Sequence, residues 1–504
     1  MKKCAQKLGR KFAYSGKGTY FACESIQYSL MQRLTAILCF IVCVVCCTGV
    51  RAQDKDFTPA GENPALLAKL LTQYQDHFKE HLSQLPSGDK KDYVEIYSDR
   101  WKDIQARFDK QEIWTATDAQ EYLDKMVSVV VKGNPQLRDY PFHCYFSRSS
   151  VPNAAYIGEG IILFNMGLFD RLSDESQAAF ILCHEISHYY LRHQEKAIDK
   201  YVTTINSPEV QAKLRKIKGS AFHQGEQVHD LVKGLAFDSR RHSRDHEAEA
   251  DSMAVVLLSH TGWMLSGATS ALAMLDSVDK DDFDADGFLR RTFDAADYPF
   301  KNKWLAKEGG LLGGHARLKA VNSDGVADSL KTHPDCSKRI KLIEPLVNGG
   351  EGKGGSGGGA AVGMVGGRAF VVDSNRFVQL RERCRYEVIE YAFVDSEYSQ
   401  SLWLALELLE QRPGDVYAVA QIGRVLNGIY RAQKVHSLGK FVELPSPYNA
   451  ENYNALLQFV ANLYLLDLAE ISYYFLKPHH PAMDRYELFR QAYVEAVRMR
   501  AEQD

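Results

Sequence analysis

The sequence predicts an α+β fold in which a helix-dominated core with a small β-sheet is followed by an all-α domain. Apolar residues recur at helical spacing in 174–188 and 244–258, and again within 401–500. A glycine-rich segment, 349–367, separates these two regions, because a run with so few side chains cannot pack. The small sheet is inferred from motifs described below.

These patterns divide the chain into four parts. We expect a signal-peptide region at 1–52, a first domain at 57–348, a flexible linker at 349–367 and a helical domain at 368–504. Within the last part, Pro413-Gly414 separates an apolar stripe at 401–411 from another at 416–431. Helix, turn and helix in this order are typical of tetratricopeptide-type repeats and equally of a plain helical bundle, so both remain open.

The run His184-Glu185-Ile186-Ser187-His188 is a candidate metal-binding motif. Ser173 is the expected N-cap of the helix that carries it. With about 3.6 residues per helical turn, the two histidines lie on one face and can bind a single ion. Zinc with three protein ligands keeps a position open for water and lowers the pKa of that water to roughly 7. Glu185 is then the expected general base.

Glu247 is the candidate for the third zinc ligand, with one zinc ion expected per chain. It opens the helical pattern at 244–258, where Asp251 lies one turn further on the same face. Asp251 can therefore accept a hydrogen bond from a ligand histidine. His246 and Glu249 are neighbouring alternatives for the third ligand, and a solvated charged face is the alternative to a metal site.

Together with further motifs, these residues resemble the HtpX/BepA group of zinc metallopeptidases, which includes the CAAX prenyl endopeptidases. The similarity spans about 60–346 and includes the segment from Asn153 to Leu168, the run Ser243-Arg244-x-x-Glu247-x-x-Ala250-Asp251, and Thr332-His333-Pro334 with Arg339-Ile340. The resemblance implies that 57–348 is a gluzincin peptidase domain in which His184, His188 and Glu247 bind zinc. It also implies that the Asn153 segment forms an edge strand that pairs with an extended substrate.

His333, near the end of this domain, has two possible roles. The resemblance places it close to the active site, where it could stabilise a developing oxyanion or cap the zinc at rest. The alternative is a turn residue fixed by Pro334. Arg339, six residues later, is expected to pair with a carboxylate such as Asp251.

The segment 200–243 lies between the two metal motifs and is polar and basic. It is expected to be either a gating loop or a surface insertion.

The N-terminal region predicts export. The stretch from Leu34 to Val50 is almost wholly apolar, follows Arg33, and ends in a small-residue site with Gln53 as the expected mature start. Its length is short for a membrane span, which needs about twenty residues. Translation is expected to begin at Met31. We therefore expect a protein of the periplasm or the extracellular space, soluble after cleavage, with no transmembrane segment in the mature chain.

Composition and cysteine content indicate the general class of protein and the number of disulfides that it could form. With 25% charged residues and a net charge of -3, the chain is predicted to be an ordinary globular protein that does not bind nucleic acid. Four cysteines remain after the signal peptide, namely Cys144, Cys183, Cys336 and Cys384, and they permit up to two disulfides. Cys183 is expected to be a small buried apolar residue.

One acidic run imitates a calcium-binding loop. Asp282-x-Asp284-x-Asp286-Gly287 has the correct start, but the twelfth position is Phe293, which offers no oxygen. A solvated acidic turn is therefore expected.

The sequence as a whole predicts a zinc-dependent metalloendopeptidase that cleaves extended or unfolded polypeptides. A role in cell-envelope protein quality control rests on the family analogy alone. Besides its polypeptide substrate, a protein partner bound by the helical domain is expected. One alternative function is a client-binding or chaperone-like module. Another is a latent peptidase whose His333 or whose segment 200–243 blocks the metal.

Overall fold

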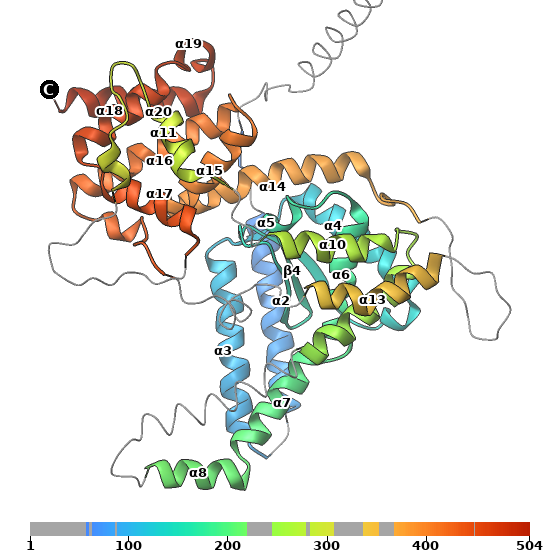
Figure 1. The fold of residues 1–504 in the computed structure, drawn as a ribbon. Coiled ribbons are helices and arrows are strands. Elements are labelled where there is room, and N and C mark those ends of the chain that lie inside the picture. The colour runs from blue at the N-terminus through green and yellow to red at the C-terminus, as the bar shows by residue number, and fades with distance from the viewer. Residues whose placement is uncertain are drawn as a thin grey trace, which may run out of the picture. The chain divides into compact units, whose positions relative to one another are not determined.

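The computed structural model describes residues 57–59, 63–85, 88–218, 244–278, 283–306, 336–351, 367–447 and 449–503. The predicted signal-peptide region, His333 and most of the predicted linker lie outside these residues. Helices dominate the described chain and enclose a small four-stranded sheet (Figure 1). The predicted α+β class, with a helix-dominated core, a small sheet and further helices, is confirmed.

The sheet has the strand order β1-β2-β4-β3. Its strands are β1 (Ile113–Trp114), β2 (His143–Ser147), β3 (Ala154–Gly158) and β4 (Ile161–Asn165). β2 and β4 are parallel, whereas β1 pairs with β2 and β3 pairs with β4 in antiparallel fashion. β3 therefore lies at one edge of the sheet, and the prediction of an edge strand in the Asn153 segment is confirmed.

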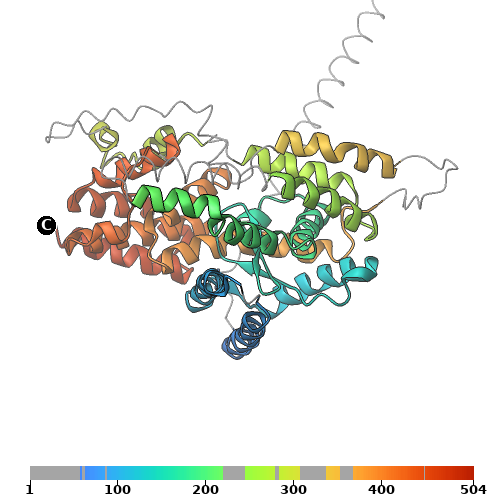
Figure 2. The same ribbon diagram turned by 90° about the horizontal axis from the view of Figure 1, so that it is seen from below.

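Helices cover both faces of the sheet. Because side chains alternate along a strand, Ile161 and Leu163 of β4 pack in one apolar cluster and Ile162 and Phe164 in another. The first cluster contains α2 (Pro64–Ser83) and α3 (Lys90–Asp109), which lie side by side and are seen end-on in Figure 2. The second contains α4 (Thr117–Gly133) and α6 (Glu175–Tyr190).

Helix α6 carries the candidate metal motif and is buried over most of its length. Its N-cap is Asp174, whose side chain accepts a hydrogen bond of 3.1 Å from the N–H of Gln177. The prediction of Ser173 as the N-cap is wrong, because Ser173 instead donates its N–H to the Gln177 side chain. Helix α10 (Ser266–Ser277) approaches α6 so closely that a Cβ at Gly267 would lie 2.6 Å from the backbone of Ser176.

The remaining described elements of the predicted first domain, 57–348, are all helices. They are η1 (Pro135–Leu137), α5 (Met166–Phe169), α7 (His193–Ile205), α8 (Pro208–Lys218), a helix at 244–259, α11 (Ala285–Thr292), η2 (Asn302–Leu305) and α13 (Cys336–Glu351). Helix α13 continues past Gly349, where the linker was predicted to begin. The calcium-like run starts a helix, because the Asp284 side chain accepts a 3.0 Å hydrogen bond from Gly287 N–H and caps α11.

The C-terminal region is helical, as predicted. It contains α14 (Ser374–Val394), α15 (Tyr398–Gln411), α16 (Val416–Lys434), η3 (Leu438–Lys440), α17 (Glu451–Ala461), α18 (Leu465–Leu476), α19 (His480–Met483) and α20 (Glu487–Ala501). Helix α16 is buried on most of its surface, since α15, α18 and α20 all pack against it. Helix α14 also packs on α5, and α11 packs on α17, so the buried residues of both regions form one cluster.

Two further predictions concern the cysteines and membrane spans. Cys144, Cys183, Cys336 and Cys384 are buried and not joined in disulfides. Among the described residues, no single helix has the length and apolar character needed to cross a membrane, and only the pair α17 and α18, bent by 113° at its break, meets both criteria together.

Glu175 connects the first turn of α6 to the chain that follows the predicted linker. Its carboxylate is fully buried and accepts hydrogen bonds from the N–H groups of Val371, Val372 and Asp373, at 2.7, 2.8 and 2.8 Å. The hydroxyl of Tyr122 and the indole N–H of Trp263 donate to it as well. A buried charge is stable only when it is paired or hydrogen-bonded, and these five donors meet that condition.

We predict that Glu175→Ala lowers the free energy of unfolding by about 3–5 kcal/mol, because it leaves several buried N–H groups without an acceptor. Urea denaturation followed by circular dichroism measures this change. Glu209→Ala is the control, since Glu209 is exposed on α8 and its ion pair within the described residues is with the exposed Lys213. Equal denaturation midpoints for the two variants would show that the Glu175 contacts contribute little.

Candidate metal centre and active site

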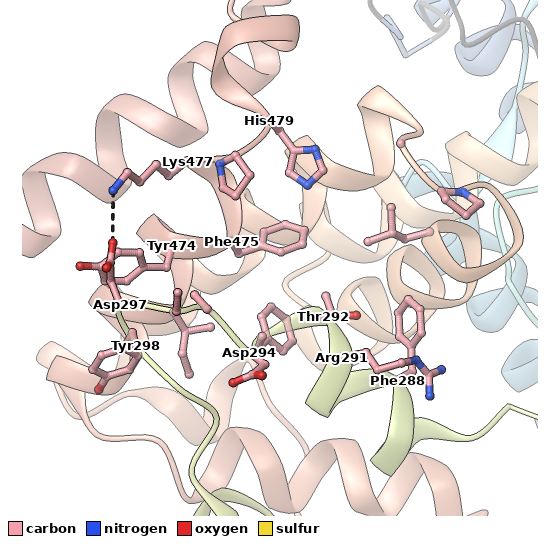
Figure 3. Close-up of a pocket in the computed structure, with 18 of the residues that line it drawn as sticks. Phe288, Arg291, Thr292, Asp294, Asp297, Tyr298, Tyr474, Phe475, Lys477 and His479 are labelled. Carbon is pink, nitrogen blue, oxygen red and sulfur yellow. Dashed lines mark ion pairs between the residues drawn. The ribbon is translucent and has the colours of Figure 1, made fainter.

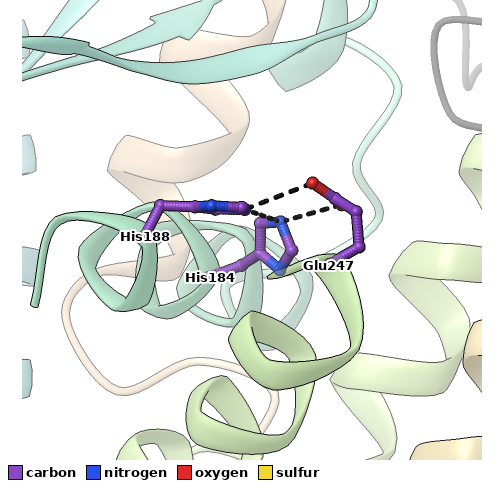
Figure 4. Close-up of side chains that lie close together, drawn as sticks. All are labelled: His184, His188 and Glu247. Atoms are coloured by element: carbon purple, nitrogen blue, oxygen red, sulfur yellow. Dashed lines mark hydrogen bonds and ion pairs between the residues drawn. The ribbon is translucent and has the colours of Figure 1, made fainter. Parts of the chain in front are cut away.

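Three side chains from two helices converge on one point. His184 and His188 project from the same face of α6, and Glu247 reaches them from the helix at 244–259 (Figure 4). The Nε2 atoms of the two histidines are 3.0 Å apart. The Glu247 carboxylate oxygens lie 3.5 Å from Nε2 of His184 and 3.4 Å from Nε2 of His188. One ligand atom from each residue lies within 4.8 Å of the others, so the group could hold one metal ion.

Asp251 supports this cluster from behind. Its Oδ1 lies 2.9 Å from Nδ1 of His184, which leaves Nε2 of that ring directed at Glu247. Arg339 of α13 donates two hydrogen bonds of 2.7 Å to the two oxygens of Asp251. The predicted pairing of Arg339 with Asp251 is thus confirmed. Nη1 of Arg339 also lies 3.2 Å from a Glu247 oxygen, so one guanidinium holds both carboxylates.

His193 contacts the Nδ1 atom of His188, as Asp251 contacts the Nδ1 atom of His184. Their Nδ1 atoms are 3.0 Å apart, and Nε2 of His193 lies 3.2 Å from a Glu249 oxygen. His246 stacks on the His193 ring with centroids 4.3 Å apart. His246 and Glu249, the alternatives for the third ligand, therefore flank His193 and not the two motif histidines.

The motif pattern missed His193 because it lies beyond the end of α6. The chain turns at Arg192, where φ is 55°, and only this turn brings the His193 ring back to His188. The sequence shows only a histidine five residues after His188, and a spacing of five residues does not place two side chains on the same face of a helix.

The electrostatics of the cluster favour a cation. Burial alone would lower the pKa of His184, but the hydrogen bonds and charges of Asp251 and Glu247 raise it to about 10. Burial would likewise raise the pKa of Glu247, yet hydrogen bonds from His184 and His188 and the charge of Arg339 hold it well below its usual range. Two ionised carboxylates thus stabilise positive charge at this point, as a metal-binding site requires.

Glu185 is buried next to the cluster. Its Oε2 accepts a hydrogen bond of 2.7 Å from the N–H of Tyr156 in β3. Burial raises the pKa of Glu185, although the charges of His184 and His188 oppose the shift. A carboxyl group with a raised pKa is suited to general acid–base catalysis near neutral pH.

A cavity of about 350 Å³ opens over these groups. Its walls combine the metal cluster with the edge strand, and the lining residues are Asn153, Ala154, Ala155, Tyr156, Leu168, Phe180, Ile181, His184, Glu185, His188, Gln194, Glu247, Leu272, Leu275 and Arg339. The cavity therefore brings β3 and the candidate general base to the same space.

The outer edge of β3 presents backbone groups to this cavity. The backbone carbonyl of Asn153 accepts a hydrogen bond from the N–H of Asn165, so this carbonyl faces β4. Since antiparallel pairing alternates along a strand, the N–H and C=O groups of Ala154 and Tyr156 face outward. The hydrogen bond from Tyr156 N–H to Glu185 agrees with this direction.

Two sequence predictions cannot be placed at this site. His333 lies in 307–335, outside the described residues. Of the segment 200–243, the described part belongs to α7 and α8, and 219–243 lies outside the described chain.

Comparison with known proteins gives the family of this region. Residues 117–347 match the model of peptidase family M48. This segment is thus similar to an M48 metallopeptidase domain. The matched segment includes His184, Glu185, His188, Glu247, Asp251 and Arg339 and ends before the helices that follow the predicted linker. Members of this family are zinc metallopeptidases, and two imidazoles with one carboxylate form a donor set that suits catalytic zinc. The comparison with curated proteins gave no match.

A larger cavity lies between residues 288–298 and the C-terminal helices α15 and α18, and it shares no lining residue with the first. Its volume is about 790 Å³, and aromatic side chains such as Phe288, Tyr474 and Phe475 contribute to its wall (Figure 3). Lys477 points at Asp297 across it, at 3.6 Å. None of the described residues that line it belongs to a group that could hold a metal ion.

We predict that Arg339→Met lowers the free energy of unfolding by about 3–5 kcal/mol, because it leaves the Asp251 charge buried with one partner fewer. Zinc affinity should fall about 10- to 100-fold, since Asp251 would no longer be fixed behind His184. Denaturation and competition with a zinc-binding dye measure the two effects. Arg290→Met serves as the control, because Arg290 forms an exposed pair with Asp286. Indistinguishable behaviour of the two variants would contradict the supporting role of Arg339.

Proposed function

We propose that this protein is a zinc-dependent endopeptidase that hydrolyses peptide bonds of extended or unfolded polypeptides. We further propose that it is exported to the periplasm or the extracellular space and acts in quality control of cell-envelope proteins. The observation that carries the catalytic part is the meeting of three groups in one cavity: the His184, His188 and Glu247 cluster, the Glu185 carboxylate and the outer edge of β3.

His184, His188 and Glu247 would hold the zinc ion through two imidazole nitrogens and one carboxylate. When bound, zinc polarises a substrate carbonyl as a Lewis acid and acidifies water at its open position. Asp251 fixes the orientation of the His184 ring, and His193 contacts the distal nitrogen of His188. Fixed ring orientation directs both Nε2 atoms at the same point and so preorganises the site.

Glu185 is the proposed general base. Tyr156 N–H holds one carboxylate oxygen, Oε2, while the other oxygen has no hydrogen bond within the described chain. This second oxygen can accept the proton of the attacking water and later return it to the leaving nitrogen. Its raised pKa makes the return of the proton easier than it would be for an exposed glutamate.

The edge of β3 explains the proposed preference for extended substrates. The outward N–H and C=O of Ala154 can pair with the main chain of a polypeptide, as in addition of a strand to a sheet. Such pairing requires an extended backbone, so a folded substrate would first have to open. Main-chain contacts also tolerate many side chains, which suits a peptidase of unfolded proteins.

A second candidate function is binding of a client protein by the C-terminal helices. The large cavity between these helices and residues 288–298 favours it, because apolar and aromatic walls are typical of ligand and peptide sites. In this alternative, proteolysis is secondary or absent.

We predict that wild-type protein starting at Gln53 and its Glu185→Gln variant both bind about one zinc ion, and that only the wild type cleaves casein. Loss of the base should reduce the rate by at least about 100-fold. Zinc is measured by atomic emission and cleavage by release of labelled fragments. Glu209→Gln is the matched control, since this exposed glutamate on α8 should leave both readouts unchanged.

The other outcomes separate the alternatives. Zinc binding without cleavage by the wild type would favour client binding or a latent peptidase. A latent enzyme would gain activity after deletion of 219–243 or replacement of His333, whereas a client-binding protein would not. Absence of zinc binding would contradict the metal site itself.

A further inference from the structure

The backbone of Tyr156 is fully engaged at the edge where a substrate would pair. Its N–H donates to Glu185, and its C=O accepts a hydrogen bond from the side-chain amide of Gln194. Both groups face away from β4, toward the cavity. Within the described parts of the chain, the outward backbone groups of Ala154 have no hydrogen-bond partner, whereas both of those of Tyr156 do.

Gln194 is held in this position by its surroundings. It is the second residue of α7 and lines the cavity next to His188. Arg100 of α3 donates to its side-chain oxygen at 3.4 Å, and the same guanidinium pairs with Glu159 at 2.6 Å. Glu159 lies in the turn between β3 and β4, where Gly158, Glu159 and Gly160 all have positive φ. The amide is thus fixed between α3 and the end of the edge strand.

A carboxamide has the same donor and acceptor groups as a peptide bond. The Gln194 N–H on the Tyr156 carbonyl therefore occupies the place that the N–H of a paired substrate residue would take. We propose that Gln194 is a specificity-determining residue that limits, on the Tyr156 side, how far a substrate main chain can pair with β3. This inference rests on the proposed function, because it concerns the polypeptide that the same cavity would bind.

A third cavity adjoins Tyr156, and a substrate that paired with β3 past Tyr156 would enter it. Its volume is about 300 Å³, and it shares Tyr156 with the cavity above the metal cluster. Rings of Tyr140 and Tyr189 line it together with the Glu159 and Arg100 pair. A substrate that displaced Gln194 could continue along β3 toward this space, whereas one stopped by Gln194 pairs only at Ala154.

The test compares peptide binding as a function of peptide length. Zinc-loaded Glu185→Gln protein is used with and without Gln194→Ala, so that binding is measured without hydrolysis. The probes are blocked, fluorescent alanine–serine peptides of about three to nine residues, because main-chain pairing does not depend on side chains. Affinity is measured by fluorescence anisotropy. Gln120→Ala is the matched control, since Gln120 also donates its amide to a strand carbonyl, that of Cys144, at 3.0 Å, but lines neither cavity.

We predict that affinity stops rising at a shorter peptide length when Gln194 is present. Gln194→Ala should bind the longest peptides about two- to tenfold more tightly, since one further main-chain hydrogen bond becomes available. Gln120→Ala should leave the length profile unchanged. A residue that only stabilised the fold would not shift this profile.

Three outcomes would overturn the inference: equal length profiles with and without Gln194, no binding by either protein, or weaker binding of Gln194→Ala at every length. Failure of the proposed function is recognised separately. It would appear as zinc-loaded wild type that leaves casein intact, and the binding profile would still decide the role of Gln194.

Discussion

The structure around the candidate site depends on one constraint, which is that α6 buries several ionisable side chains and each must find a partner. Glu175 at the start of α6 accepts hydrogen bonds from the backbone N–H groups of 371–373, and Glu185 accepts one from the N–H of Tyr156. His184 contacts Asp251, which in turn binds Arg339. These pairs connect α6 to β3, to the helix at 244–259, to α13 and to the chain that precedes α14. The arrangement of the metal cluster is therefore part of the same packing that stabilises the domain.

Local spacing explains which parts of this site could be predicted from the sequence. The i and i+4 positions of His184 and His188 place both rings on one face of α6, and the one-turn spacing of Glu247 and Asp251 does the same on the second helix. The structure brings the two pairs together, and it pairs Arg339 with Asp251 as expected. The helix-dominated fold with a small sheet and an edge strand also agrees with the prediction.

The features that were missed depend on contacts without a sequence pattern. Tyr156 acts through its backbone N–H, which every residue except proline possesses, so its contact with Glu185 left no signal. His193 and Gln194 reach the cavity only because the chain turns at Arg192. Glu175 resembled an ordinary acidic residue of a first helical turn, yet it is fully buried by a segment almost 200 positions later in the chain.

The central claim is that His184, His188 and Glu247 bind one zinc ion through two imidazoles and a carboxylate. X-ray absorption at the zinc edge of the purified, zinc-loaded protein tests this most directly, because the fine structure reports the kind and number of ligand atoms. The account predicts a first shell of nitrogen and oxygen atoms at about 2.0–2.2 Å, with the multiple scattering of two imidazole rings. A shell containing sulfur at about 2.3 Å, or one without imidazole scattering, would contradict it.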